Sequence, residues 1–272
     1  MIFLADFVLN ADTYYSVEAD KRYMSVHQYF EFCGTLGYQG CEARAMAKLR
    51  GEYKQETTDS MLVGSYVDSY FEGTLDKFKE EHPEIFTQKG KLKASYEKAD
   101  KMIARCEKDD LFMKFMSGEK QKIFTANLFD CDWKCKLDSY IPGVAIVDLK
   151  TTASMHKAWR VKDYGYASFV EFWGYTIQLA VYQKIVEICT GDKLPCYIAA
   201  VSKDEVPEIK IIEIDDFTLE NALNEVKMNM PTVLSVKNGE AEPIRCEQCE
   251  YCHETEVLTD PINFRDLITE TE

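Results

Sequence analysis

The stretch that decides the fold is residues 132–152, DWKCKLDSYIPGVAIVDLKTT. Residues 132–138 alternate between polar and apolar side chains, and residues 144–150 form an apolar run that ends in charge, which is typical of strands. Between them, Pro142 and Gly143 stand in the order that favours a tight turn. The stretch therefore predicts two strands, joined by a turn, that bring charged side chains together.

Three charged residues stand on these strands. Asp148 and Lys150 point to the same face of one strand, because side chains alternate along it, and the turn brings Asp138 alongside. A strict two-residue turn would pair Asp138 with Val147, so the two carboxylates share a face only if the loop is odd in length or a strand carries a bulge. Taken alone, this arrangement is also consistent with a surface salt bridge.

Two carboxylates on one face of a sheet can hold Mg²⁺ or Mn²⁺, which prefer oxygen ligands. We predict Asp138 and Asp148 as metal ligands, and the carbonyl oxygen of Leu149 as a further one. The metal would lower the pKa of a bound water and stabilise charge on a phosphate. Lys150 would orient that water or neutralise the developing charge.

Residues 168–190 form a long, aromatic-rich helical pattern after these strands. Gln178 and Tyr182 are four residues apart and therefore lie on one face of this helix. Gln178 could contact a phosphate or a metal-bound water, and Tyr182 could contact a base or the DNA backbone. Ordinary helix packing explains the pair equally well.

The order of elements is helices, three strands, a helix, two strands and a helix, which favours an α/β fold with a mixed sheet wrapped by helices. We expect a single domain over residues 1–272, with a mainly helical part at 1–118, a sheet core at 119–236 and a cysteine-rich tail at 237–272 that packs back on the N-terminal part. The helical patterns lie at 26–38, 41–53, 59–73, 91–116, 168–190 and 217–236, and the strand patterns lie at 121–129, 132–138, 144–150, 195–202 and 208–215.

The composition bounds the class of protein. Hydrophobic residues make up 46% and charged residues 29% of the chain, as in ordinary globular proteins. No apolar run approaches the roughly 18 residues that span a bilayer, and the N-terminal stretch MIFLADFVLNAD lacks the features of a secretory signal. We therefore expect a cytoplasmic protein without a membrane partner. The net charge of −15 weighs against a nucleic-acid partner, although bound divalent ions would reverse the local charge.

The whole pattern, D…DLKTT followed by QxxxY, resembles the RecB-type nuclease motifs of the PD-(D/E)XK superfamily. It looks more like the phage and prophage exonucleases related to the RecE exonuclease, and the similarity runs from about residue 25 to 255. The resemblance implies an αβββαβ core, two-metal hydrolysis of phosphodiester bonds and processing of double-stranded DNA ends, often beside a single-strand annealing recombinase. It also suggests a ring-like homo-oligomer.

Carried onto this sequence, the resemblance makes Asp138 and Asp148 metal ligands, Lys150 the catalytic lysine, and Gln178 and Tyr182 the downstream motif. The leading hypothesis is therefore a Mg²⁺-dependent DNA exonuclease that serves phage or prophage recombination. The alternative is a catalytically inactive module of the same fold, with a structural metal cluster, that binds DNA or a protein partner. The complete set of acidic and basic residues disfavours the alternative, because buried charges without a role are costly.

One motif of these relatives differs here. They usually have a histidine in the pattern G-x-x-x-H, whereas in this chain Gly64 leads to Asp68. Asp68 can still bind Mg²⁺ through oxygen, and we predict that it points toward Asp138 and Asp148. Glu72, one helical turn further on, is the second candidate.

Cys246, Cys249 and Cys252 form the pattern CxxCxxC in a chain with ten cysteines. The spacing matches the first three cysteines of the bacterial ferredoxin run, which hold an iron–sulfur cluster together with a remote fourth ligand. Structural zinc more often uses two separated CxxC pairs, although His253 could supply a nitrogen. We predict a [4Fe–4S] cluster, with zinc or unliganded thiols as the alternatives.

Cys41 is the candidate for the fourth ligand. One N-terminal and three C-terminal cysteines resemble the arrangement in the iron–sulfur nucleases related to AddB and to CRISPR adaptation nucleases, although their C-terminal spacing is usually wider. Cys33 is the rival, but it lies within an apolar helical pattern that suits a packed thiol. An iron–sulfur redox protein is disfavoured, because no G-x-G-x-x-G motif follows a strand.

Overall fold

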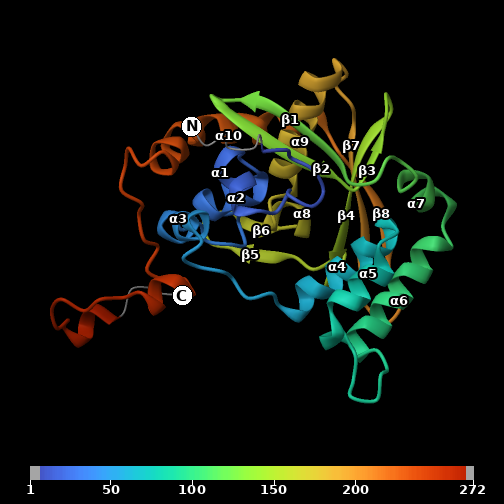
Figure 1. The fold of residues 1–272 in the computed structure, drawn as a ribbon, viewed down its shortest axis with the longest axis horizontal. Helices are drawn as coiled ribbons and strands as arrows, with labels where there is room; N and C mark the ends of the chain where they lie inside the picture. The colour runs from blue at the N-terminus through green and yellow to red at the C-terminus, as the bar shows by residue number, and fades with distance from the viewer. Residues whose placement is uncertain (1–6, 268–272) are drawn as a thin grey trace, which may run out of the picture.

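The computed structural model describes residues 7–267. Residues 1–6, part of the stretch that lacks a secretory signal pattern, and residues 268–272, the end of the predicted tail, lie outside the described residues. The described chain is an α/β structure in which helices cover both faces of a mixed sheet (Figure 1). The predicted fold class is confirmed.

The central sheet has four strands in the order β3-β4-β7-β8. β4 (Ala145–Thr152) lies parallel to β7 (Cys196–Ser202), and β3 (Ser139–Ile141) and β8 (Ile209–Ile214) flank this pair in antiparallel orientation. β4 and β7 are largely buried along their length, which is why their sequences are nearly continuous apolar runs.

The helices around the sheet begin and end at recognisable capping residues. Ser25 caps α2 by accepting a hydrogen bond from Gln28 N, and Gly73 ends α4 in the left-handed conformation. None of the helices between residues 7 and 267 combines the length and the apolar content that crossing a bilayer demands. The helices are α1 (Val17–Arg22), α2 (Val26–Cys33), α3 (Glu42–Arg50), α4 (Asp59–Glu72), α5 (Leu75–Glu81), α6 (Ala94–Glu107), α7 (Asp110–Phe115), α8 (Phe169–Phe172), α9 (Tyr175–Thr190), α10 (Asp216–Lys237) and α11 (Glu250–Glu254), with 3₁₀ turns η1 (Pro83–Ile85) and η2 (Phe264–Leu267); outside the central sheet, β1 (Lys122–Leu128) pairs with β2 (Cys131–Leu137), and β5 (Trp159–Val161) pairs with β6 (Gly165–Ala167).

Alternate residues of β4 belong to two separate hydrophobic cores. Val147 and Leu149 pack in the core that contains α4 and α6, whereas Ile146 packs in the core that contains α2, α9 and α10. Because side chains alternate along a strand, Asp148 and Lys150 project on the same side as Ile146, toward α9. The alternation therefore decides which helix can supply partners to the charged pair.

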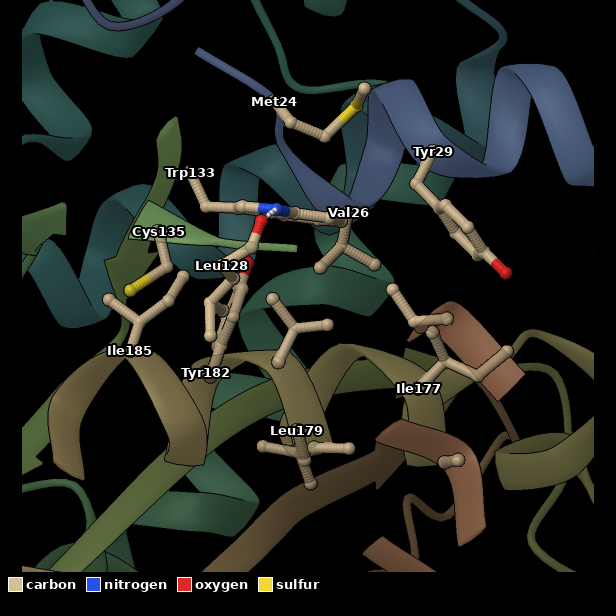
Figure 2. Close-up of a cluster of buried hydrophobic side chains, with 14 of the residues drawn as sticks. Met24, Val26, Tyr29, Leu128, Trp133, Cys135, Ile177, Leu179, Tyr182 and Ile185 are labelled. Atoms are coloured by element: carbon tan, nitrogen blue, oxygen red, sulfur yellow. Dashed lines mark hydrogen bonds between the residues drawn. The ribbon is translucent and has the colours of Figure 1, made fainter. Parts of the chain in front are cut away.

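The β1–β2 ladder is a long hairpin that rises away from the central sheet (Figure 1). Trp133 of β2 is fully buried, and its Nε1 donates a hydrogen bond to Leu128 O at 3.1 Å. Figure 2 shows this indole with Met24 on one side and Tyr182 of α9 on the other. The ladder thus joins the N-terminal helices to α9 through a shared apolar core.

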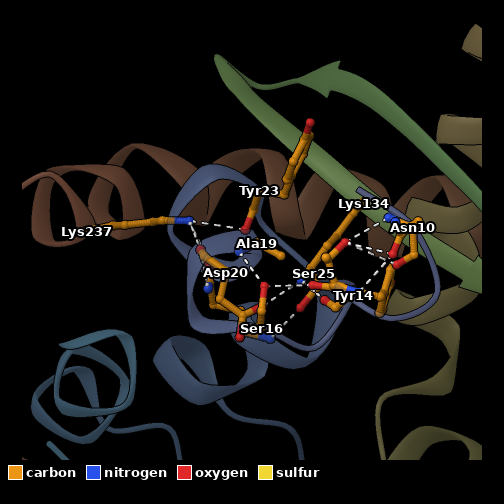
Figure 3. A network of polar contacts seen from close by, with 11 residues as sticks. Asn10, Tyr14, Ser16, Ala19, Asp20, Tyr23, Ser25, Lys134 and Lys237 are labelled. Carbon is orange, nitrogen blue, oxygen red and sulfur yellow. Dashed lines mark hydrogen bonds and ion pairs between the residues drawn. The ribbon is translucent and has the colours of Figure 1, made fainter. Parts of the chain in front are cut away.

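A polar network anchors the N-terminal segment to this scaffold (Figure 3). Lys134 Nζ of β2 donates to Tyr14 O at 2.5 Å and lies 2.7 Å from Asp20 Oδ1. Lys237 Nζ of α10 donates to Asp20 O at 3.0 Å and to Tyr23 O at 3.4 Å. Since a buried ammonium group is stable only when it is paired or hydrogen-bonded, these two lysines hold the loop and α1 in place.

Four local predictions differ from the structure. The strand predicted at 132–138 was expected to form a hairpin with 144–150, but β2 ends at Leu137 and pairs with β1, and the separate strand β3 pairs with β4 instead. The predicted helix at 91–116 is two helices, because the Asp109 side chain accepts a hydrogen bond from Phe112 N and caps a new helix. The predicted helix at 168–190 is divided at Gly174, which adopts a left-handed conformation with a φ of 71°. The polar loop expected after β4 contains the β5–β6 hairpin.

Candidate active site

A cleft of about 740 Å³ lies between the sheet and the N-terminal helices. Its lining comes from α2, α3 and α4 on one side and from β2, β4 and α9 on the other. The cleft brings together all the acidic, basic and downstream residues that the sequence singled out for catalysis or metal binding: Asp68, Glu72, Asp138, Asp148, Leu149, Lys150, Gln178 and Tyr182.

The position of Asp138 follows from the register of the β3–β4 hairpin. Ser139 pairs with Val147, so the loop is odd in length, and continuing the register places Asp138 opposite Asp148. This is the arrangement in which the two carboxylates share a face of the sheet. Asp138 Oδ2 also accepts a hydrogen bond from Leu149 N at 2.8 Å, which fixes the carboxylate beside β4.

Asp148 lies at the centre of a buried polar network. Gln178 Nε2 donates to Asp148 Oδ1 at 2.8 Å and to Tyr182 Oη at 3.1 Å. Lys150 Nζ lies 2.5 Å from Asp148 Oδ2 and 4.8 Å from the centre of the Tyr175 ring. Asp148 Oδ2 is buried and contacts the Lys150 ammonium group, with no further polar partner.

Burial and neighbouring charge shift the pKa values in the cleft. Burial raises the pKa of Asp68 well above its usual value, and the negative charges of Asp138 and Asp148 raise it further. Burial and the Asp148 charge raise the pKa of Asp138 to about 6. Burial alone would lower the pKa of Lys150, but the Asp148 carboxylate outweighs it and the pKa is raised. The cleft therefore holds more negative charge than burial favours, and a cation would relieve it.

The residues present fit a hard divalent cation. Asp68, Asp138 and Asp148 offer carboxylate oxygens, which Mg²⁺ and Mn²⁺ prefer to nitrogen or sulfur. Asp148 Oδ2 is buried with the Lys150 ammonium group as its one polar partner, so it keeps a lone pair for a bound cation or its water. The donor chemistry and the remaining acceptor capacity of this oxygen thus agree.

Replacing Asp138 with asparagine should stabilise the metal-free protein at pH 8. The folded pKa of about 6 exceeds the unfolded value of about 3.9. The ionised carboxylate therefore destabilises the folded state. This contribution has its full size above pH 6 and becomes smaller as the pH falls toward 4. Asparagine has no charge and keeps an oxygen for Leu149 N–H. Thermal melts in EDTA should give Asp138→Asn the higher melting temperature at pH 8, with the difference shrinking by pH 4. A more stable wild type at pH 8 without metal would contradict this account.

Asp68 and Glu72 reach the cleft from α4. Gly64 stands one turn before Asp68 on the same helix, and a Cβ at Gly64 would lie 3.5 Å from Thr151 Oγ1 of β4. This is an ordinary contact distance, so α4 lies close to the strand that bears Asp148, and a small side chain would also fit at Gly64. Burial raises the pKa of Glu72, with Lys136 opposing and Asp138 adding to the shift.

Several cleft residues were not singled out from the sequence. Lys134 and Lys136 follow the two-residue alternation of β2 that leads to Asp138, so this period could have identified them. His27 and Gln121 also line the cleft. Nothing in the sequence around these last two residues marks them as functional.

A second group of reactive side chains lies where the C-terminal tail meets the start of α3. The sulfur atoms of Cys41, Cys246, Cys249 and Cys252 all lie within 4.8 Å of one another, and Cys41 Sγ is 3.6 Å from Cys252 Sγ. Cys33, the predicted rival, is exposed and does not belong to the group. Four thiols at this spacing could bind a metal.

The environment of the thiols favours metal binding at one of them in particular. Burial would raise the pKa of Cys246, but hydrogen bonds from the backbone of Gln248 and from Cys249 outweigh burial and lower it to about 7. A thiol with a lowered pKa is more readily deprotonated, and the thiolate is the form that binds metals.

Comparison with known proteins gives a match to one family. Residues 25–255 match the family described as "PDDEXK-like domain of unknown function (DUF3799)". The crystal structure of a Eubacterium rectale protein described as "Putative exonuclease" has a TM-score of 0.95 and 54% sequence identity, and the match covers 97% of this chain and 100% of that chain. No curated protein matches significantly.

The crystal structure of SSO0001 also matches, with 14% identity over 68% of this chain and 81% of that chain. Its TM-score of 0.27 is too low to support an argument about fold or function. The family match and the Eubacterium rectale structure together confirm the predicted resemblance to PDDEXK-like nucleases. The chain belongs to the DUF3799 family of PDDEXK-like domains.

Proposed function

We propose that this protein is a Mg²⁺- or Mn²⁺-dependent DNA exonuclease that hydrolyses phosphodiester bonds at double-stranded DNA ends. The observation that carries the proposal is the meeting of Asp138, Asp148 and Lys150 in one cleft of a PDDEXK-like fold. The description of the Eubacterium rectale relative as an exonuclease supports the same class of reaction.

The carboxylates would hold the cation. Asp138 and Asp148 face each other across the hairpin, Asp68 would be the third acidic ligand, and the carbonyl oxygen of Leu149 a further one. A bound divalent cation supplies a water of lowered pKa and stabilises charge on the phosphate. Lys150 stays protonated because Asp148 raises its pKa, so its ammonium group can neutralise the charge that develops on the scissile phosphate.

Gln178 and Tyr182 act in this proposal as positioning residues. The Gln178 amide holds Asp148 Oδ1 and contacts Tyr182 Oη, and both side chains are at most 5% exposed. Outer partners of this kind fix the orientation of a metal-binding carboxylate. The contact with Asp148 gives Gln178 a role that does not require it to touch DNA.

Linear and covalently closed circular duplexes test the proposal directly. With Mg²⁺, the purified protein should degrade linear DNA from its ends and leave the closed circle intact, and EDTA should stop the reaction. Degradation of both forms would indicate an endonuclease. Degradation of neither, in Mg²⁺ or Mn²⁺, would instead favour the inactive module that binds DNA or a protein partner.

The β5–β6 hairpin offers a surface for the DNA. Arg160 pairs with Tyr166 across the hairpin, and both side chains are exposed. Lys157 and Lys162 lie on the same short segment, which has Asp163 as its one acidic residue between 157 and 166. Basic side chains beside exposed aromatic rings suit phosphates and bases. This local positive charge answers the objection raised by the net charge of −15.

Reversing the charge of Arg160 and Lys162 with glutamate should weaken DNA binding by about tenfold or more at low salt, because two phosphate contacts are lost. Fluorescence anisotropy with a labelled duplex, in a buffer that contains Ca²⁺ and no EDTA, measures the affinity. The slope of log affinity against log salt concentration should become shallower by about two, one for each lost phosphate contact. Lys108→Glu with Lys227→Glu is the matched control, since both residues are exposed and lie on other elements. Equal losses in both double variants would show a general effect of charge.

The cysteine group would hold a structural metal. A tetrahedral zinc ion, with Zn–S distances of about 2.3 Å, separates its sulfurs by about 3.8 Å, close to the 3.6 Å and 3.9 Å between Cys252 Sγ and the sulfurs of Cys41 and Cys246. A [4Fe–4S] cluster places an iron in front of each sulfur and needs wider separations. These separations fit a single ion better than the iron–sulfur cluster that the sequence spacing suggests.

We extend the proposal to the cellular setting on two grounds. Ten thiols suit a reducing compartment, so we place the protein in the cytoplasm. From the resemblance to phage exonucleases, we propose that it acts in phage or prophage recombination, beside a single-strand annealing recombinase, and that it forms a homo-oligomer.

A further inference from the structure

Two buried side-chain atoms in the described part of the chain lack a hydrogen-bond partner, and both are oxygens: Asp148 Oδ2 and Gln121 Oε1. Both residues line the same cleft. Because nearly all buried polar atoms in folded proteins are hydrogen-bonded, an exception calls for a functional explanation or for a bound species. The Asp148 oxygen has the Lys150 ammonium group 2.5 Å away, whereas no motif accounts for Gln121.

Gln121 also has an unusual backbone conformation. Its φ is 52°, in the left-handed region that residues other than glycine, asparagine and aspartate rarely adopt. Lys122 pairs with Leu137, and continuing this register places Gln121 opposite Asp138. Strained conformations persist where the surrounding structure holds a residue in place, and they concentrate at functional sites.

A narrow crevice that adjoins the cleft, too small to hold a water molecule, shows which residues surround Gln121. Its polar lining consists of Asp68, Glu72, Gln121 and Asp138, and its other lining residues are apolar. Three carboxylates and one amide, all of which also line the larger cleft, therefore meet around a crevice with no lysine or arginine in its lining. Burial is the main cause that raises the pKa of all three carboxyl groups.

We propose that the Gln121 amide oxygen is a further ligand of the divalent cation that Asp68 and Asp138 hold. Amide oxygens bind the same hard cations as carboxylates do. A neutral donor also completes the coordination without adding a further negative charge where carboxylates already repel one another. The inference rests on the proposed nuclease site and adds a ligand to it from the residue before β1.

Cation binding measured without DNA tests this role. Mn²⁺ titrations followed by electron paramagnetic resonance give the affinity of each variant, and thermal melts in EDTA give its stability. Gln121→Gly removes the oxygen but relieves the left-handed backbone. It should therefore keep or raise the melting temperature and yet weaken Mn²⁺ binding by about tenfold or more. Gln121→Glu keeps an oxygen and should bind Mn²⁺ at least as tightly as wild type at pH 8.

Asp130→Gly is the matched control. Asp130 has a φ of 60° and lies at the opposite end of the same β1–β2 ladder, where it is exposed. The substitution relieves the same kind of backbone conformation but removes no group from the cleft. It should leave the Mn²⁺ affinity unchanged.

Native Mn²⁺ affinity in a stable Gln121→Gly variant would overturn this proposal, and so would a wild-type chain that binds no Mn²⁺. The proposed activity can fail separately. If Mn²⁺ binding depends on Gln121 but the wild type hydrolyses no DNA, the exonuclease proposal is wrong and the ligand assignment stands.

Discussion

Asp148→Asn is expected to lower the rate of Mg²⁺-dependent DNA hydrolysis by about 1000-fold or more. Asp148 is the candidate ligand that contacts both Lys150 and Gln178. Asparagine keeps the shape of the side chain and an oxygen for the Gln178 amide, so the loss reports the missing charge and not a packing defect. Release of acid-soluble nucleotides from a linear duplex measures the rate.

Lys150→Met should cause a loss of similar size, because an uncharged side chain cannot neutralise charge on the phosphate. Each substitution leaves the other member of a buried ion pair alone, so circular dichroism and melting curves must show that the variant is folded. Asp132→Asn is the control: it removes an exposed carboxylate from β2 and should keep the native rate. A folded Asp148→Asn variant with a rate within about tenfold of wild type would refute the assigned site.

Cys41→Ser is expected to remove the bound metal and to lower the melting temperature by roughly 10 °C, because metal binding and folding are coupled in thiolate sites. Cys41 Sγ is buried against Cys252 Sγ, so the serine breaks the link between α3 and the tail. Differential scanning calorimetry measures the shift, and elemental analysis of anaerobically purified protein measures zinc and iron.

Cys33→Ser provides the comparison for this result. Cys33 precedes Cys41 by eight residues but is exposed and lies outside the group, so its metal content and stability should be close to native. Retention of metal in Cys41→Ser would show that the fourth ligand is wrong. About one zinc per chain would support the single ion, whereas about four irons per chain would support the [4Fe–4S] prediction.

For cleft residues on the same strand or the same helix, the repeat of side-chain directions along that element was enough to predict that they share a face. Alternation along β4 put Asp148 and Lys150 on one face, and the helical repeat put Gln178 and Tyr182 on one face of α9. The parity of the β3–β4 loop was open in the sequence, because proline and glycine fix where a turn lies but not its length. The structure resolves it with an odd loop that places Asp138 opposite Asp148.

Other features depend on contacts that a sequence pattern does not contain. In the sequence, Gln121 is the first residue of the strand predicted at 121–129, and only the tertiary structure reveals its left-handed φ and its unpartnered oxygen. The strands of the β5–β6 hairpin have three residues each, too few for alternation to be recognised. Aspartate is unfavourable but tolerated in a helix interior, so Asp109 alone does not predict a break between α6 and α7. The break is seen in the structure, where the Asp109 side chain accepts a hydrogen bond from Phe112 N.

The order in which the chain is synthesised determines when the cysteine group can bind a metal. Cys41 and Cys252 are 211 residues apart, and at about 5–20 residues per second a ribosome needs about 10–40 s to synthesise the intervening chain. For nearly all of that interval, until Cys246 is made, the first thiol has none of its three partners. Asp68, Asp138 and Asp148 are all synthesised within it, so a nascent chain possesses its carboxylates before the thiolates that tie the tail to α3 can close around a metal.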